Sequence, residues 1–232
     1  EISVRDWSSD VCSSDLLKMV AVTDVAVEGS QQVLVAKDSP ARGLADLAGK
    51  KVAVLSPNTI CVLSIRTALR AQALAPDSIA FAPVAPPEHA NVLSSGEVAA
   101  TCTSDPFRTL MIEKLGARPI LDSSINELAA YPVGGYVVST TFAGEHGDAL
   151  TRFQRALRKA TEFANANPAA VREALPKFAN VDAEVANRVV INRFVEAADT
   201  ATVRTKVQAI ADAMQTYQMV GKPVDVAGFL LG

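Results

Sequence analysis

Two short polar stretches hold the residues of this sequence that are best placed to bind a small molecule. Asn58-Thr59-Ile60 and Asp105-Pro106-Phe107 each lie where an expected strand gives way to an expected helix. The first backbone N–H groups of a helix have no partner within it and carry its positive dipole end, so they bind anions or polar head groups. Either stretch alone could be an ordinary helix cap, but two at one sheet edge favour a binding cleft.

The groups needed for catalysis lack their usual sequence context. Ser56 and Ser104 lie outside any nucleophile-elbow motif and are better explained as loop or capping residues. Glu88 and His89 could form an acid–base pair, but adjacent helical residues point in different directions. His146 lies in a glycine-flanked loop, and solvation or capping accounts for both histidines. The sequence has no glycine-rich phosphate loop, and we expect no catalytic residue, metal or cofactor.

The cysteines leave two interpretations open. Three cysteines and two histidines include no pair at metal-ligand spacing, so a structural zinc site is not expected. Cys61 and Cys102 both fall at strand-to-helix or strand-end positions of one expected sheet. They could form a disulfide if the protein is exported, or remain two small buried thiols, because the sequence does not fix the separation of their Cα atoms.

The overall composition excludes several classes of protein. Of the 232 residues, 49% are hydrophobic but only 5% are aromatic, which favours tightly packed α/β layers over an aromatic-rich β-sandwich. The net charge of -3, with both signs interspersed, provides no basic surface for nucleic acid or an anionic membrane. No apolar run reaches the roughly 18 residues that span a bilayer. The length allows one large domain or two small lobes.

Four apolar strands separated by three helices organise the middle of the chain. The strands are expected at 51–55, 79–84, 98–102 and 118–121, and the helices at 60–73, 87–95 and 106–115. Strands that alternate with helices of this length pair in parallel, because a parallel neighbour is reached only through a crossover, and both faces of such a sheet are covered. Ligands then bind at the carboxyl ends of the strands. The loops at these ends are 56–59, 85–88 and 103–107.

The segments on either side do not continue this repeat. Runs rich in β-forming residues lie at 17–27 and 31–37, and a further strand is expected at 131–139. Helices are expected over 150–164, from 167 to a point before Pro176, over 182–190 and over 203–217. The repeat therefore resembles a lobe that the chain enters and leaves once, with hinge strands at 31–37 and 135–139.

Residues 1–16 do not fit the rest of the sequence. The stretch 6–16 has no hydrophobic period and is crowded with Ser and Asp, which favour caps and turns. It resembles one reading frame of a sequencing-library adapter, so we expect 1–16 to be non-native and the natural start, with any export signal, to be lost. A disordered natural N-terminus is the alternative.

Three motifs in a fixed order carry a resemblance to a known family. The stretch 46–50 reads Asp-Leu-Ala-Gly-Lys, 96–100 reads Gly-Glu-Val-Ala-Ala, and 105–107 reads Asp-Pro-Phe. They resemble the Asp-Leu-Lys-Gly-Lys, Gly-x-Val/Ile-Asp-Ala and Glu/Asp-Pro-Phe/Tyr motifs of the nitrate/taurine/alkanesulfonate family, with Ala99 in place of an Asp. These proteins are the solute-binding components of ABC importers, and some bind thiamine precursors. The resemblance extends through 164–171 and 221–226.

The resemblance implies an α/β fold of the type II periplasmic-binding-protein class, with two doubly wound lobes joined by two hinge strands. Residues 41–127 would form a complete second lobe, and 17–40 with 128–232 an incomplete first lobe. The residues that we expect to contact the ligand are Asn58, Thr59, Ile60, Ser104, Asp105, Phe107, Gly135 and Tyr136.

The function that the resemblance implies is binding without chemistry. A small solute, such as a sulfonate, nitrate or thiamine-precursor heterocycle, would be held between the lobes by hinge closure and passed to an ABC permease. The resemblance also implies a monomeric periplasmic protein or cell-surface lipoprotein with no nucleic-acid partner. Because part of one lobe would be missing, we expect this chain to bind its solute weakly. The alternatives are a pyrimidine-synthesis enzyme of the same superfamily and the effector domain of a LysR-type transcription regulator.

Overall fold

The structure, a computed structural model, describes residues 16–124, 128–178, 181–195 and 200–231. The chain folds into two compact units. Unit 1 comprises Glu1–Val25, Tyr131–Pro168 and Arg193–Gly232, and unit 2 comprises Ala26–Ala130 and Ala169–Asn192. Apart from Leu16, the segment predicted to be non-native lies outside the described residues.

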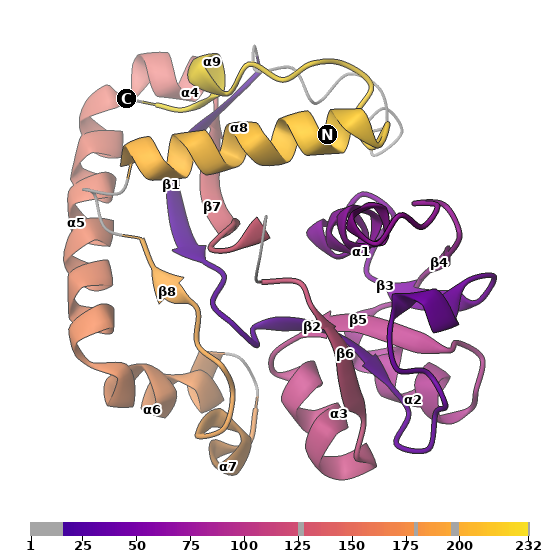
Figure 1. The fold of residues 1–232 in the computed structure, drawn as a ribbon. Coiled ribbons are helices and arrows are strands. Elements are labelled where there is room, and N and C mark those ends of the chain that lie inside the picture. Colours follow the sequence, from indigo (N-terminus) through magenta and orange to yellow (C-terminus); the bar gives the residue numbers. More distant parts are fainter. Residues whose placement is uncertain (1–15, 125–127, 179–180, 196–199, 232) are drawn as a thin grey trace, which may run out of the picture. The chain divides into compact units, whose positions relative to one another are not determined.

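Unit 2 contains a five-stranded sheet in the order β4-β3-β5-β2-β6 (Figure 1). The strands are β2 (Gln31–Val35), β3 (Lys51–Val54), β4 (Ala80–Pro83), β5 (Ala100–Ser104) and β6 (Arg118–Asp122). Strand β3 pairs in parallel with β4 and β5, whereas β2 lies antiparallel between β5 and β6. The four predicted strands are therefore confirmed, and so is the parallel pairing of β3 with β4 and β5. The prediction missed β2, through which β6 joins the sheet by antiparallel pairing.

The antiparallel strand β2 lies in the run that we predicted to be a hinge. Its residues Val33, Leu34 and Val35 are each 0% exposed, so both faces of the strand are apolar and covered. A strand with two apolar faces is stabilised inside a sheet and not in an exposed connector. Unit 2 consequently starts at Ala26 and not at 41, and it gains the segment Ala169–Asn192, which the predicted lobe 41–127 did not include.

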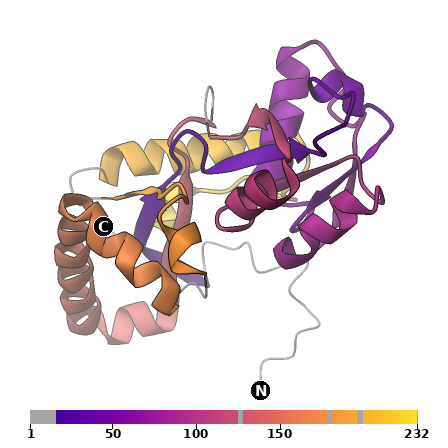
Figure 2. The ribbon, with the colours of Figure 1, turned by 90° about the horizontal axis from the view of Figure 1, so that it is seen from below.

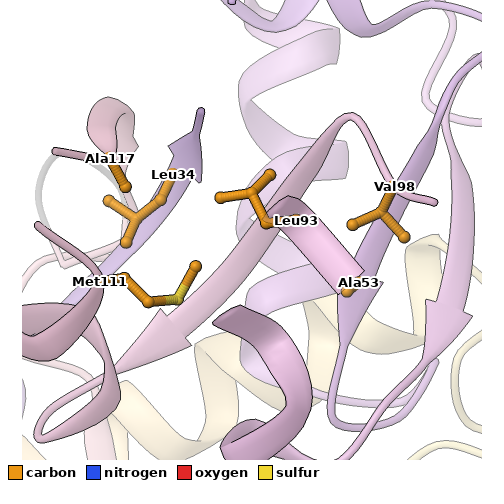
Figure 3. Packing of buried hydrophobic residues seen from close by; sticks show 6 residues of the cluster. All are labelled: Leu34, Ala53, Leu93, Val98, Met111 and Ala117. Carbon is orange, nitrogen blue, oxygen red and sulfur yellow. The ribbon is translucent and has the colours of Figure 1, made fainter. Parts of the chain in front are cut away.

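Helices cover both faces of this sheet. Helix α1 (Ile60–Ala71) packs on one face, with the short helix η1 (Leu44–Leu47) against it. Short helix η2 (Pro86–Glu88), α2 (His89–Ser94) and α3 (Phe107–Leu115) follow strands β4 and β5. The core of the second face is a cluster of buried side chains from β2, β3, α2, α3 and the segments next to them (Figure 3). Its members are Leu34, Ala53, Leu93, Val98, Met111 and Ala117.

Unit 1 contains an antiparallel three-stranded sheet in the order β7-β1-β8. Its strands are β1 (Leu17–Val25), β7 (Pro132–Ser139) and β8 (Arg193–Phe194), and its helices are α4 (Thr140–Glu145), α5 (Gly147–Ala166), α8 (Thr200–Thr216) and α9 (Val226–Phe229). Gln154 Nε2 donates a hydrogen bond to the Val20 carbonyl, which holds α5 along β1 (Figures 1 and 2). The second predicted hinge, 135–139, is part of β7 and so lies within the sheet of unit 1.

Two predicted helices end at other positions. Helix α6 (Pro168–Phe178) includes Pro176, which we expected to lie beyond its end, because a proline this close to the C-terminus interrupts only the last turn. Helix α7 spans only Ala183–Ala186 instead of 182–190. The residues after α7 bond to other parts of unit 2, as described below. None of the described helices combines the length and apolar character that a membrane crossing requires.

Candidate functional site

The three loops predicted to bind a ligand lie at one edge of the unit 2 sheet. Strand β3 pairs with β4 as far as Val54 and Pro83, and with β5 at Ala53 and Thr101. Because these strands are parallel, the loops that follow them leave the sheet at the same edge. The prediction that loops 56–59, 85–88 and 103–107 share an edge is confirmed.

The start of α1 offers backbone donors that no side chain caps. Thr59, at the N-cap position, has an extended backbone with φ -104 and ψ 163 degrees. Its hydroxyl donates to the Ser56 carbonyl at 2.9 Å instead of accepting from the helix, and no side-chain cap is present. Asn58 is exposed beside this turn. The first N–H groups of α1 therefore provide the positive helix end that suits an anion or a polar head group.

A disulfide places the end of β5 next to this helix start. Cys61 and Cys102 are bonded, with Cα atoms 6.0 Å apart and side chains 4% and 2% exposed. Of the two interpretations that the sequence left open, the structure supports the disulfide. Side chains two residues apart in a strand share a face, so the exposed Ser104 lies on the same side of β5 as Cys102 and α1.

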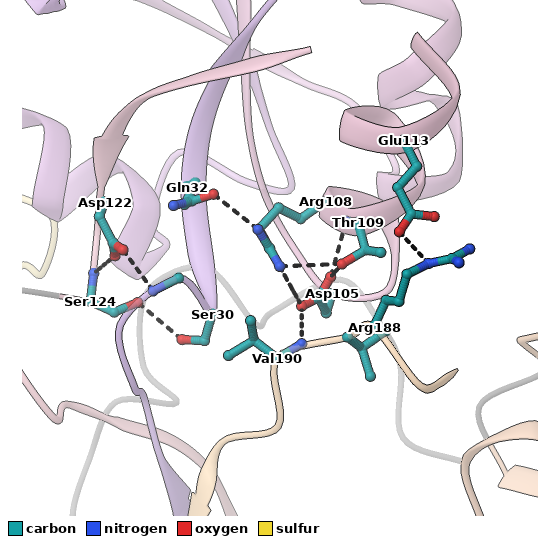
Figure 4. Close-up of polar contacts among 12 residues, drawn as sticks. Ser30, Gln32, Asp105, Arg108, Thr109, Glu113, Asp122, Ser124, Arg188 and Val190 are labelled. Carbon is teal, nitrogen blue, oxygen red and sulfur yellow. Dashed lines mark hydrogen bonds and ion pairs between the residues drawn. The ribbon is translucent and has the colours of Figure 1, made fainter. Parts of the chain in front are cut away.

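Asp105, a predicted ligand contact, instead holds parts of unit 2 together (Figure 4). Its carboxylate accepts hydrogen bonds from Arg108 Nε and Nη2, from the backbone N and Oγ1 of Thr109, and at 2.7 Å from the backbone N of Val190. The side chain is only 9% exposed. Arg108 also donates to Gln32 Oε1 at 3.1 Å, which ties the start of α3 to β2. The Asp105 carboxylate is thus fully used within the unit.

Two arginine side chains make further contacts that hold the segment after α7. Arg188 forms an ion pair with Glu113 of α3 (Figure 4) and another with Glu184. The hydrogen bonds that the Arg188 guanidinium donates to the Glu184 and Glu113 carboxylates raise its pKa. Arg172 Nη1 lies 3.0 Å from the carbonyl oxygens of both Ala186 and Val189. The sequence near 182–192 does not indicate the contact of Arg188 with Glu113, because Glu113 lies in α3, far away along the chain.

A second carboxylate organises the same sheet edge at the end of β6. Asp122 accepts hydrogen bonds from the backbone N of Gly29 at 2.6 Å and of Ser124 at 2.8 Å. The hydroxyls of Ser30 and Ser124, both buried, are 3.0 Å apart. Figure 4 shows these residues grouped around the first residues of β2. Asp122 was not among the predicted site residues, although an acidic residue at a strand end was a usable signal.

His89 is buried, although its position in the sequence predicted a solvated or capping side chain. The side chain is 1% exposed, and Nε2 donates to the Val84 carbonyl at 3.1 Å, while Nδ1 has no hydrogen-bond partner in the described part of the chain. Burial lowers the pKa of the imidazole. The expectation of a solvated or capping histidine is therefore wrong. The cause is tertiary, because α2 packs His89 against the loop after β4.

The other predicted contacts are distributed over both units. Phe107, half-buried, is the first residue of α3. Gly135 and Tyr136 lie in β7 of unit 1. A Cβ atom on Gly135 would come within 2.8 Å of the Ala21 carbonyl oxygen, and the 48% exposed Tyr136 ring packs edge-on against Phe153 with centroids 5.1 Å apart. That these residues contact a ligand stays a prediction.

The described residues contain no cluster of three or more His, Cys, Asp or Glu side chains that could hold a metal ion. The hydroxyls of Ser56 and Ser104 have no hydrogen bond to a histidine within the same described ranges. What the site offers chemically is a set of hydrogen-bond donors at a helix start, next to an exposed serine.

Comparison with solved structures finds the same fold in periplasmic binding proteins. The alkanesulfonate-binding protein SsuA from Xanthomonas axonopodis pv. citri, solved bound to MOPS, is 22% identical over 94% of this chain and 74% of its own, with a TM-score of 0.75. The periplasmic aliphatic sulphonate-binding protein SsuA from Escherichia coli is 22% identical over 93% of this chain and 69% of its own, with a TM-score of 0.69. At this identity the likeness establishes the fold.

One solved structure with the same fold is an enzyme. The desulfurization enzyme DSZB is 18% identical over 93% of this chain and 77% of its own, with a TM-score of 0.67. No curated protein matches the sequence at a significant level. The family model described as NMT1-like matches residues 12–179, well over half of the chain. The chain therefore belongs to the NMT1-like family and has the mixed α/β fold of the periplasmic binding proteins, as the resemblance of its motifs predicted.

Proposed function

We propose that this chain is the extracytoplasmic solute-binding component of an ABC importer. The single observation that carries the proposal is the uncapped start of α1, which the disulfide holds beside the exposed Ser104 at the carboxyl edge of the sheet. Such an edge is the usual ligand position in an open α/β sheet. The family and the fold shared with two sulfonate-binding proteins support this assignment.

We propose a small anionic or polar solute, with a sulfonate or nitrate as the first candidates and a thiamine-precursor heterocycle as the next. Asn58, Thr59, Ile60 and Ser104 would make the contacts from unit 2, through backbone N–H groups and neutral side chains. Phe107, Gly135 and Tyr136 remain proposed contacts, of which the two rings suit a heterocycle. Asp105 would act only indirectly, because its carboxylate is already hydrogen bonded.

An oxidising compartment agrees with this role. Disulfides persist in secreted and periplasmic proteins and are rare in reducing compartments. The bonded Cys61 and Cys102 therefore support a periplasmic or cell-surface location, where a membrane permease would receive the solute. A monomeric state is part of the same proposal.

Binding assays with a backbone-donor variant test the proposal. Isothermal titration with ethanesulfonate, nitrate and an aminopyrimidine should find a ligand among the three, and a ligand at 100 times its Kd should stabilise the fold by about 2.7 kcal/mol. Replacement Ile60→Pro removes one N–H at the first helical position, where proline is tolerated, and the extended Thr59 before it accepts a following proline. We expect this variant to lose about tenfold in affinity, since one charge-assisted hydrogen bond is removed.

The matched control is Ile60→Ala, which shortens the same side chain but keeps the N–H. It should bind like the wild type. Equal affinities of the proline and alanine variants would exclude the start of α1 as the binding position. Failure of all three probes to bind would contradict the proposed solute classes.

Catalysis is the competing proposal, because DSZB shares the fold. Incubation of the chain with an aryl sulfinate, followed by measurement of released sulfite, separates the two. We expect the compound to be recovered unchanged. Sulfite released in proportion to protein concentration would favour an enzyme.

A further inference from the structure

The disulfide joins the two loops that provide the proposed contacts of unit 2. Cys61 is the second residue of α1 and directly follows Ile60, and Cys102 lies two residues before Ser104 in β5. Both cysteine side chains are buried, at 4% and 2% exposure. The crosslink therefore fixes the distance between the two loops from the interior of the unit, without occupying the surface where a solute would bind.

Two buried serines extend this connection to a third loop. Ser64 Oγ lies 2.9 Å from the Cys61 carbonyl oxygen and 2.8 Å from Ser123 Oγ. Ser123 Oγ is in turn 3.8 Å from Cys102 Sγ. Both serines are at most 5% exposed. The first turn of α1, the end of β5 and the turn after β6 thus meet around one disulfide.

The first turn of α1 needs such a support. Helix ends fray because their first N–H groups lack partners within the helix, and side-chain caps normally offset this. Here Thr59 provides no cap, since its hydroxyl bonds to the Ser56 carbonyl. The uncapped donors that make the turn suitable for a ligand also make it less stable, and the covalent link to β5 opposes that loss.

We propose that the Cys61–Cys102 disulfide is a positioning element of the ligand site, which holds the first turn of α1 beside Ser104 before the solute arrives. The inference rests on the proposed function and adds that the site is ordered before the solute binds. Ordering a loop at the moment of binding costs free energy, so a site that is already ordered binds more tightly with the same contacts.

The test compares wild type with the double variant Cys61→Ala/Cys102→Ala. Titration at 15 °C with ethanesulfonate, nitrate and the aminopyrimidine should show an affinity about tenfold lower for the variant, with the loss in the entropy of binding. The stability-matched control is Leu47→Ala, which removes a 0% exposed side chain from η1, an element that provides none of the proposed ligand contacts. Leu47→Ala should lower the melting temperature yet bind like the wild type.

Hydrogen exchange gives a readout that needs no ligand. The Leu63 amide, bonded to the Thr59 carbonyl, should exchange faster in the double variant, whereas the Gln72 amide at the other end of α1 should keep its rate. If the double variant does not fold, wild type reduced under native conditions takes its place. Unchanged Leu63 exchange, or unchanged affinity for a probe that the wild type binds, would overturn the positioning role. If the wild type binds no probe but the Leu63 amide still exchanges faster in the double variant, only the proposed function would be overturned.

Discussion

Unit 2 contains a carboxylate that accepts several hydrogen bonds from its loops, whereas unit 1 contains neutral amides that each hold one backbone segment. In unit 2, Asp105 accepts five hydrogen bonds, from three residues. In unit 1, the amide of Asn165 donates to the Phe194 carbonyl and accepts from the Phe194 N–H, and Gln208 holds Val224 and Val226 in the same two-way manner.

The difference follows from the two chemical groups. A carboxylate has only acceptor sites and can gather several donors at one point, while an amide offers one oxygen and one NH2 and suits a single backbone segment. Unit 2 therefore concentrates its loop contacts in a few side chains, and unit 1 distributes them. Because its loop contacts depend on a few side chains, the stability of unit 2 should be more sensitive to a single substitution than that of unit 1.

The strongest test of this comparison is Asp105→Ala. It removes all five bonds and leaves the partly buried Arg108 without its carboxylate, so we expect the free energy of unfolding of unit 2 to fall by about 3 kcal/mol. Urea denaturation measures the change, and exchange of the Val190 amide reports the released segment. The matched control, Asp77→Ala, breaks the ion pair of an 84% exposed aspartate with Arg66 and should have no measurable effect. Equal losses from both substitutions would refute the concentration of contacts at Asp105.

Within unit 1 the largest effect should come from the backbone of the sheet and not from a polar side chain. The Cβ atom of Gly135→Ala would meet the Ala21 carbonyl oxygen at 2.8 Å, and because that atom is backbone, β1 and β7 must separate. We expect a loss of about 2 kcal/mol, as for an overpacked core position, measured by thermal unfolding.

The control for Gly135 is Gly144→Ala in α4, where nothing lies within 4 Å of the new atom. This replacement should be neutral or stabilise by up to about 1 kcal/mol, since alanine is the better helix former. A neutral Gly135→Ala would show that the strands of unit 1 are more adaptable than their contacts indicate.

Removal of a single side-chain amide should destabilise unit 1 less than Gly135→Ala. Asn165→Ala leaves the N–H and carbonyl of Phe194 without this partner, and we expect a loss of about 1.5 kcal/mol that 0.5 M salt does not change, because no net charge is involved. Asn167→Ala, which removes an exposed bond to the Phe163 carbonyl, should change stability by less than about 0.5 kcal/mol. A loss as large as that of Asp105→Ala would remove the distinction between the units.

The smallest expected effect is the pH dependence that His89 adds to the stability of unit 2. Because burial lowers the pKa of His89 below its ordinary value of 6.5, the unfolded chain binds the proton more readily than the folded one. His89 therefore costs no stability above about pH 6.5, and stability falls as the pH drops from 6.5 toward the lowered pKa. The melting temperature at pH 5.5 should thus be slightly lower than at pH 7.5.

The substitution His89→Gln keeps a donor for the Val84 carbonyl but does not titrate, so this part of the pH dependence should disappear. His146→Gln, at an exposed position, should leave it in place. An unaltered pH profile in His89→Gln would assign the acid sensitivity to other groups.

Several features of the fold could be predicted because their causes are local. The apolar runs of β3, β4, β5 and β6 and the helices between them are confirmed, since each depends on neighbouring residues. Gly49, Gly96 and Gly116, which follow η1, α2 and α3, have φ values of 73, 75 and 63 degrees, which only glycine adopts readily. The shared edge of the three loops followed from the same local pattern and the geometry of parallel strands.

The features that could not be predicted depend on residues far apart in the chain. The role of Asp105 is set by Val190, 85 residues later, and the position of β2 is set by strands 65 or more residues further on. The motif Asp-Pro-Phe indicated a helix start correctly, but a carboxylate at such a start serves equally to bind a ligand or to hold a neighbouring loop. Only the arrangement of the donors around it decides between the two.

Local patterns in the sequence thus predicted β3 to β6 with the helices between them, the edge where the candidate site lies and the family to which the chain belongs. The tertiary structure decided that β2 enters the sheet between β5 and β6, that Cys61 and Cys102 are bonded, and that His89 and Asp105 are enclosed. The physical reason is that backbone propensity and apolar patterning act over a few residues, whereas burial and hydrogen-bond partners depend on segments that meet only when the chain has folded.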